Sequence, residues 1–260
     1  MKCIILAAGY SKRLYPLTQN MPKQFIKIGD KLMIEHILDN ISHINEIDEV
    51  IVVVNNKFFP IFDDWSKSFC SGRNSCKKFS KKIFDKKITI LNDGTNSNEE
   101  RLGTVGDLHF AISSRKIDDE VMVIGGDNLF ETDLRNMISV FNDKKRSVIA
   151  ARDLGDPQKL ALKLGVVVTD ANLKIIDFEE KPPQPKSSLA ATLIYIFTKE
   201  DVRELENCIR MRAKLDNAGN FIRHLITKRE VYCYKFMEPW FDIGNHEELR
   251  QVQDIYSKKA

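Results

Sequence analysis

The sequence predicts an α/β fold in which an open, mostly parallel sheet carries helices on both faces and gains antiparallel strands in its C-terminal half. Short β-branched runs alternate with segments of helical period as far as about residue 150, the order of a sheet with crossover helices. Val50–Val54 is apolar without a break, as in a strand covered on both faces. Beyond residue 160, strand patterns follow one another without intervening helices, which indicates antiparallel additions. We therefore expect a Rossmann-like arrangement.

The expected elements of the parallel half alternate between strand and helix. The strands are Lys2–Ala8, Val50–Asn55, Ile88–Leu91, Val121–Ile124 and Ser147–Ala151. The crossover helices are Leu32–Ile44, Gly103–Ser113 and Asp133–Phe141. In the first of these helices, Ile34, Ile37, Leu38 and Ile41 fall on one face, as an amphipathic helix on a sheet requires.

The later part of the chain is expected to add three strands before it returns to helices. The strands are Leu164–Thr169, Leu173–Glu179 and Ala190–Phe197. Helices near Lys199–Arg212 and Asn217–Thr227, a strand at Glu230–Phe236 and a helix from Asn245 complete the prediction.

Length and composition favour one sizeable domain of a soluble globular protein over residues 1–260. Lys+Arg number 40 and Asp+Glu 37, and a surplus this small argues against a nucleic-acid partner. No apolar run is long enough for a membrane span or an export signal, so we expect a cytoplasmic protein without a membrane partner. The five cysteines form no CxxC pair and are expected to be reduced thiols.

A basic segment at about residues 70–87 differs from the rest of the chain. It holds Arg73 and six lysines but few large apolar side chains. Such a charge run usually forms a solvated surface, so we interpret it as an insertion rather than a nucleic-acid patch.

The stretch Leu6–Thr18, followed by Pro22 and Lys23, is the most informative part of the sequence. A short strand ends in small residues and Gly9, which let backbone N–H groups approach an anion. Arg13 and Lys23 then supply cations that neutralise phosphate. The glycine spacing of a dinucleotide-binding turn is absent, as is a Walker A motif. We therefore expect a phosphate-binding loop of another kind.

This stretch resembles the signature of the nucleotide-sugar pyrophosphorylases, the sugar-1-phosphate nucleotidylyltransferases typified by the glucose-1-phosphate thymidylyltransferases. It departs from the signature at Ser11, where the family usually has a second glycine. We interpret serine as a tolerated small replacement that offers a hydroxyl group.

Four further motifs resemble those of the family and occur in the family's order, leaving out the basic insertion. They are Gly103-Thr104-Val105-Gly106, Gly126-Asp127-Asn128, Glu179-Glu180-Lys181-Pro182 and Trp240-Phe241-Asp242-Ile243-Gly244. Asp127 follows an expected parallel strand, and ligands of open α/β sheets bind at the carboxyl ends of such strands.

The resemblance implies a role for each matched residue. Catalysis falls to Arg13, which would bind the leaving pyrophosphate, and Lys23, which would bind the α-phosphate. Nucleotide binding falls to Leu6, Ala8, Gly9, Tyr10, Ser11, Gly103 and Asp127. Acceptor binding falls to Asn128, Glu179, Lys181 and Thr192. Asp127 and Asp242 would hold Mg²⁺.

The implied reaction joins a nucleoside triphosphate to a sugar 1-phosphate, giving an NDP-sugar and pyrophosphate. The acceptor is the open question, because Leu193 stands where the thymidylyltransferases usually have glycine. A cytidylyltransferase acting on a small acceptor such as phosphocholine is the alternative. It would need aromatic faces around the quaternary ammonium, and Phe178, Tyr195 and Trp240 are the candidates.

A regulatory protein that binds nucleotide sugars without catalysis is a weaker alternative, because both metal-binding aspartates are present. The expected partners are a nucleoside triphosphate and a phosphorylated small molecule. By resemblance, the chain is also a candidate homo-oligomer.

Overall fold

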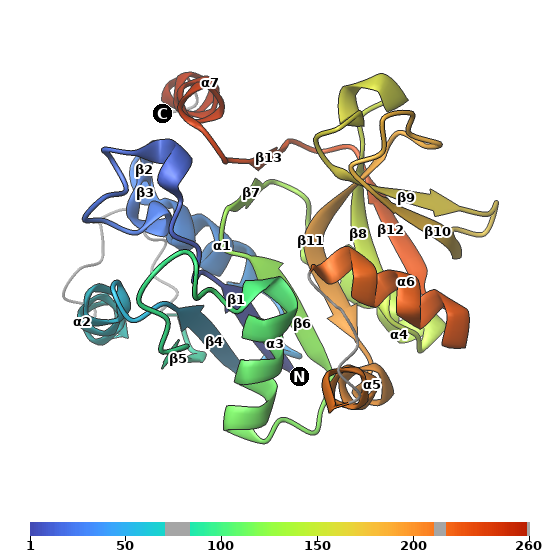
Figure 1. Cartoon of the computed structure of the whole chain (residues 1–260), viewed down its shortest axis with the longest axis horizontal. Helices are drawn as coiled ribbons and strands as arrows, with labels where there is room; N and C mark the ends of the chain where they lie inside the picture. The colour runs from blue at the N-terminus through green and yellow to red at the C-terminus, as the bar shows by residue number, and fades with distance from the viewer. Residues whose placement is uncertain (71–83, 211–216, 259–260) are drawn as a thin grey trace.

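The computed structural model describes residues 1–70, 84–210 and 217–258 (Figure 1). Most of the basic insertion expected at 70–87 lies outside the described residues, as does Cys76. Cys3, Cys208 and Cys233 are buried free thiols. Among the described helices, none has the length and apolar character needed to cross a bilayer.

The centre of the molecule is a mixed sheet, and its first half is parallel as predicted. Strands β1, β4, β5 and β6 run in the same direction in the order β6-β1-β4-β5. Their bounds are Lys2–Leu6, Glu49–Val54, Lys87–Asn92 and Val121–Gly125. Ile4 pairs with Ile51 on one side and Val123 on the other, so β1 lies in the middle of the parallel region.

The second half of the sheet is mainly antiparallel, also as predicted. β11 (Leu189–Phe197) pairs antiparallel with β6, β8 and β9. β8 is Val148–Asp153, β9 is Gly165–Thr169 and β10 is Ile175–Glu180. β12 (Tyr232–Phe236) returns parallel to β8 at the edge.

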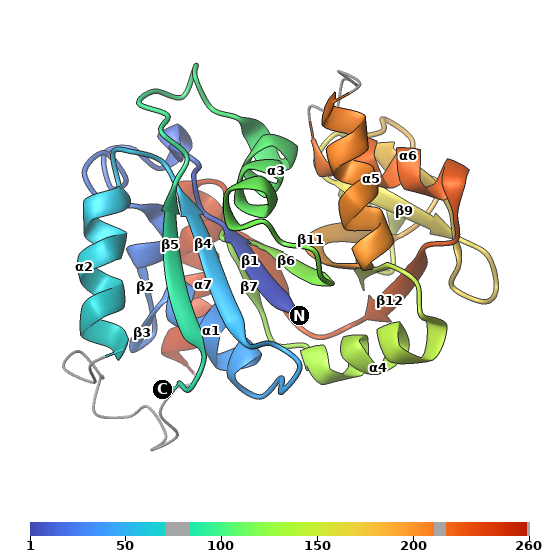
Figure 2. The same ribbon diagram turned by 90° about the horizontal axis from the view of Figure 1, so that it is seen from below.

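Helices cover both faces of the sheet, and side chains that alternate along the strands fill two cores. Cys3 and Ile5 of β1 belong to the core beneath α1, α2 and α4, whereas Ile4 belongs to the core beneath α3, α5 and α6. Figure 2 shows the sheet between α3, α5 and α6 on one side and α1 and α4 on the other. The helices are α1 (Met33–Ser42), α2 (Phe59–Cys70), α3 (Gly103–Arg115), α4 (Leu134–Lys144), α5 (Lys199–Arg210) and α6 (Ala218–Lys228).

A small outlying unit lies over the carboxyl ends of the parallel strands, and of its elements only the helix expected from Asn245 was predicted. β7 (Asn128–Phe130) and β13 (Trp240–Asp242) form a two-stranded antiparallel sheet. β2 (Lys27–Ile28) and β3 (Lys31–Leu32) form another, and α7 (His246–Ser257) packs near them through a core that includes Ile28, Ile243 and Leu249. This unit brings the end of the chain to the loop that follows β1.

Candidate active site

The loops after β1 and β6 touch at the carboxyl edge of the parallel sheet. The Gly126 N–H donates to the Leu6 carbonyl oxygen at 2.8 Å. A Cβ on Gly126 would lie 2.8 Å from that oxygen, so only glycine allows this contact without displacement of backbone. The arrangement holds Asp127 beside the loop that contains Gly9.

A cavity of about 550 Å³ lies against these loops. The residues predicted to bind nucleotide all line it: Leu6, Ala8, Gly9, Tyr10, Ser11, Gly103 and Asp127. The two predicted catalytic cations, Arg13 and Lys23, line it as well. The structure therefore brings together residues that are far apart in the sequence, although their individual roles stay predictions.

Lys23 is the buried cation of the site, with 6% of its surface exposed. Its ammonium donates to Asp127 Oδ2 at 3.1 Å and to the Ile243 carbonyl oxygen at 2.8 Å. A short 3₁₀ helix, Lys23–Phe25, aims it from the loop after β1. Because both partners stabilise the charged form, the ammonium is held as a fixed positive charge at the cavity wall.

Arg13 is the exposed cation of the site. It lies on the 3₁₀ helix Lys12–Leu14, and a Cβ on Gly244 would come within 3.0 Å of its Nη2 atom. The backbone after β13 therefore passes directly beside the guanidinium. Among the described residues, no carboxylate pairs with Arg13, which leaves its charge available to an anion.

The two predicted metal-binding aspartates meet through the β7–β13 pairing. Asp242 lies opposite Asn128 in the register, and the Ile243 N–H donates to the Asp127 carbonyl oxygen at 3.2 Å. Asp242 is exposed where it lines the cavity. Partial loss of hydration beside the surrounding protein, and then the charge of Asp127, raise its pKa to about 6. Two neighbouring carboxylates with hard oxygen donors fit Mg²⁺, whose charge would relieve their repulsion.

A second cavity, of about 660 Å³, adjoins the first. The residues that line both cavities are Arg13, Thr104, Leu193 and Gly244. Lys181 and Asp242 line the second cavity, and their acceptor and metal roles stay predictions. Four aromatic residues are among those that line it: Phe178 and Tyr195, which are buried, and Trp240 and Phe241.

Three residues predicted to bind the acceptor do not line this cavity. Asn128 is 2% exposed and binds within the protein, where its Oδ1 accepts from Trp240 Nε1 at 2.5 Å. Thr192 is 1% exposed, and its hydroxyl donates to the Ala150 carbonyl oxygen at 2.9 Å. Both side chains hold strands together.

Glu179 is the third of these residues, and the strand alternation explains its position. Side chains of β10 alternate between faces, so Phe178 and Glu180 share the face that lines the cavity. Glu179 points the other way and forms an ion pair with Lys186 at 3.0 Å. Glu180, which directly precedes Lys181, is therefore the glutamate of β10 that lines the cavity.

Ser11 and Leu193 have left-handed backbones, with φ of 47° and 55°. This conformation favours glycine, the residue that the family pattern carries at both positions. The left-handed backbone thus adds a conformational constraint at Ser11, and its tolerance as a small residue with a hydroxyl group stays a prediction. Leu193 in addition places a large apolar side chain between the two cavities.

Sequence reasoning missed several residues that line the nucleotide cavity: Gln24, Asn98, Arg101, Thr104 and Asp107. Asn98 and Arg101 precede α3 in a loop without a periodic pattern. Asp107 lies one turn into α3, a position at which a charged residue ordinarily predicts a solvent-facing side chain. Asp107 is instead buried, and the sequence contains no signal of that burial.

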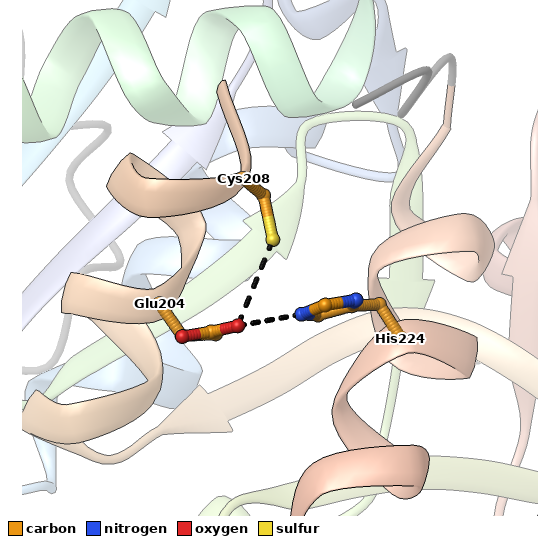
Figure 3. A group of neighbouring side chains, drawn as sticks. All are labelled: Glu204, Cys208 and His224. Carbon is orange, nitrogen blue, oxygen red and sulfur yellow. Dashed lines mark hydrogen bonds and ion pairs between the residues drawn. The ribbon is translucent and has the colours of Figure 1, made fainter. Parts of the chain in front are cut away.

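A second group of potential metal donors lies away from both cavities, between α5 and α6 (Figure 3). Glu204 Oε1 lies 2.6 Å from His224 Nε2 and 3.9 Å from Cys208 Sγ. Tetrahedral Zn²⁺ would separate its oxygen and nitrogen ligands by about 3.4 Å, given metal–ligand bonds of about 2.1 Å. The shorter distance is that of a hydrogen bond, so the pair joins the two helices.

Comparisons with known proteins give the family and the fold of the chain. The chain matches the family model described as nucleotidyl transferase over residues 2–259. It is 30% identical over 250 residues to the bifunctional protein GlmU of Methanocaldococcus jannaschii, covering 94% of this chain and 51% of that protein. The chain thus spans about half the length of this curated relative.

Two solved structures show the same fold at low sequence identity. A Bacillus anthracis protein assigned as a glucose-1-phosphate thymidylyltransferase, in complex with sucrose, superimposes with a TM-score of 0.77 at 23% identity. The match covers 98% of this chain and 95% of that one. A UDP-glucose pyrophosphorylase complexed with UDP-glucose gives 0.81 at 20% identity, covering 100% and 99%.

Proposed function

Because the chain belongs to the nucleotidyl transferase family, we propose that it transfers a nucleotidyl group from a nucleoside triphosphate to a sugar 1-phosphate, with Mg²⁺. The observation that carries this proposal is the junction of the two cavities at Arg13 and Gly244, beside Asp127, Asp242 and Lys23. One cavity would hold the triphosphate and the other the acceptor, with the reacting atoms where they meet.

The reaction needs alignment and charge neutralisation more than proton transfer. An oxygen of the acceptor phosphate attacks the α-phosphorus, a new P–O bond forms, and the bond to the β-phosphate oxygen breaks with its electron pair. Pyrophosphate leaves. The phosphate oxygen is already ionised at neutral pH, so no general base is required.

Three cations of the site would each neutralise charge on a different phosphate group, according to their positions. The buried Lys23 ammonium would stabilise charge on the α-phosphate. Arg13, which lines both cavities, would bind the departing pyrophosphate. Of the two cavities, Lys181 lines only the one proposed for the acceptor, and it would bind the acceptor phosphate.

Asp127 and Asp242 are the residues that would hold Mg²⁺. When bound, the ion would neutralise phosphate charge and fix the orientation of the triphosphate. Lys23 already bonds to Asp127, so it would position that carboxylate and the nucleotide together.

The walls of the acceptor cavity favour phosphocholine as a second candidate acceptor. Phe178, Tyr195 and Trp240 line it together with the Glu180 carboxylate. Aromatic faces and a carboxylate are the groups that bind a quaternary ammonium. Leu193 also takes space at the junction that a hexose ring would otherwise have.

A panel of nucleoside triphosphates and acceptors tests the proposal. Glucose 1-phosphate, other hexose 1-phosphates and phosphocholine are each incubated with Mg²⁺, with pyrophosphate release as the readout and mass spectrometry to identify the product. An NDP-sugar supports the first function, and a nucleotidyl-choline product supports the second. Nucleotide-sugar binding without turnover of any pair would favour a regulatory protein.

Leu193→Gly separates the two acceptors further. The substitution removes the side chain at the junction and suits the left-handed backbone. If a small acceptor is native, the variant should gain turnover of hexose 1-phosphates relative to phosphocholine.

A further inference from the structure

Two acids meet beside the nucleotide cavity, on the side of the parallel sheet where β5 ends. Asp107 of α3 lines this cavity with only 8% of its surface exposed. Asp93, which follows β5, is its neighbour, and the two carboxyl groups are close enough to hydrogen bond when one of them is protonated. The strand order separates this pair from Asp127, because β1 and β4 lie between β6 and β5.

The separation can be worked out from the sheet. Three strand spacings of about 4.8 Å put the end of β5 about 14 Å from the end of β6. A triphosphate held at Asp127 and Lys23 therefore points its nucleoside toward Asp107 when the nucleotide lies along the cavity. Asn98, Arg101, Gly103 and Thr104 line the same cavity as Asp107.

No N–H group or hydroxyl of the described residues donates to Asp107. Asp93 is anchored, since its Oδ1 accepts from the Thr95 N–H at 2.7 Å and the Thr95 hydroxyl at 2.8 Å. Asp93 Oδ2 and Asp107 Oδ1 are both buried, and a proton shared between the two carboxyl groups pairs them. Burial, and then the neighbouring Asp93, raise the pKa of Asp107 to about 7. This pairing leaves the other oxygen of Asp107, which belongs to the cavity wall, without a donor among the described residues, so a ligand in the cavity can donate to it.

We propose that Asp107 recognises the nucleoside: its carboxyl accepts a hydrogen bond from an N–H or O–H group of the bound nucleoside, and Asp93 holds it in position. The donor is either an N–H of the base or a hydroxyl of the ribose, since either group can donate a hydrogen bond to the carboxyl. The inference rests on the proposed function, because it takes the cavity as a nucleotide site.

The test measures nucleotide binding by calorimetry, so turnover is not needed. ATP, CTP, GTP, UTP and dTTP with Mg²⁺ are titrated into the intact wild-type protein and into Asp107→Ala and Asp107→Asn. The tightest ligand is then compared with its 2′-deoxy, 3′-deoxy and N-methylated-base forms. Asp143→Asn, at an exposed position on α4, is the matched control.

We expect Asp107→Ala to weaken the tightest nucleotide by about ten- to a hundred-fold, the range for a hydrogen bond to a charged group. Asp107→Asn, which keeps an acceptor oxygen, should lose less. The analogue that lacks the donor should bind wild type and Asp107→Ala equally, which identifies ribose or base as the source.

Two results would overturn the inference alone. One is wild-type affinity in Asp107→Ala, and the other is the same fold-loss for every nucleotide and analogue, which a structural role would give. If the wild-type protein binds no nucleoside triphosphate, the proposed function fails and this inference fails with it. Thermal unfolding of each variant checks that it is folded.

Discussion

Replacing Asp107 with asparagine should make the protein more stable at alkaline pH. In the folded protein, burial and the neighbouring Asp93 raise the pKa of Asp107 from 3.8 to about 7. Between these two values the folded state holds a proton that the unfolded state has lost. Stability is therefore fully present below about pH 4 and falls as the pH rises through 7.

The magnitude follows from the size of this pKa difference. A difference of about three pH units at 1.36 kcal/mol each gives an upper bound of about 4 kcal/mol lost above pH 7. Asparagine has the same shape, stays neutral and can still bond to Asp93. Asp107→Asn should therefore be more stable than wild type by about 1–4 kcal/mol at pH 8.5, and this difference should shrink to nearly zero at about pH 4.

Urea unfolding at both pH values measures this difference directly. Asp143→Asn, at the exposed position on α4, should show no comparable change between the two conditions. If Asp107→Asn were no more stable than wild type at pH 8.5, the carboxyl would not be a buried, unpaired charge.

Three further predictions concern packing and backbone. Gly126→Ala should lower stability by about 1–3 kcal/mol in thermal unfolding, because its Cβ would lie 2.8 Å from the Leu6 carbonyl oxygen; unchanged stability would contradict that contact. Ser11→Gly should raise stability by up to about 1 kcal/mol by removing a strained left-handed serine, and a loss would show that the side chain matters more than the backbone. The hydrogen bond from His224 lowers the pKa of Glu204. Glu204→Gln should therefore lower the free energy of unfolding by no more than about 1 kcal/mol at pH 7, and this loss should shrink as the pH falls below 4.5. A loss that does not change with pH would argue against the ion pair.

Much of the fold follows from local patterns. The apolar run of β4 predicts a strand buried on both faces, and all six of its residues are buried. The three strand patterns that follow residue 160 without an intervening helix predict the antiparallel half. Both features depend on the period of the side chains, which a single sequence displays directly.

The site residues that belong to a sequence motif could be predicted. Those whose place in the site depends on the direction of the side chain could not. Asp127 and Asp242 were expected to meet, but the β7–β13 pairing that joins them is too short to leave a pattern. Glu179 was predicted to bind the acceptor, whereas Glu180 is the residue of the two that lines the second cavity. The sequence does not give the register of β10, and a shift of one residue reverses the face. Thr192 bonds to Ala150 within the sheet, and its acceptor role stays a prediction.

The pair of aspartates at the cavity junction gives the most direct test of the proposed catalytic site. Pyrophosphate release is measured across a Mg²⁺ series for wild type, Asp127→Asn, Asp242→Asn and the control Asp143→Asn. We predict a loss of at least about 100-fold in both site variants, with folded protein by thermal unfolding and a normal rate in the control. A near-native rate in either site variant would contradict the assignment.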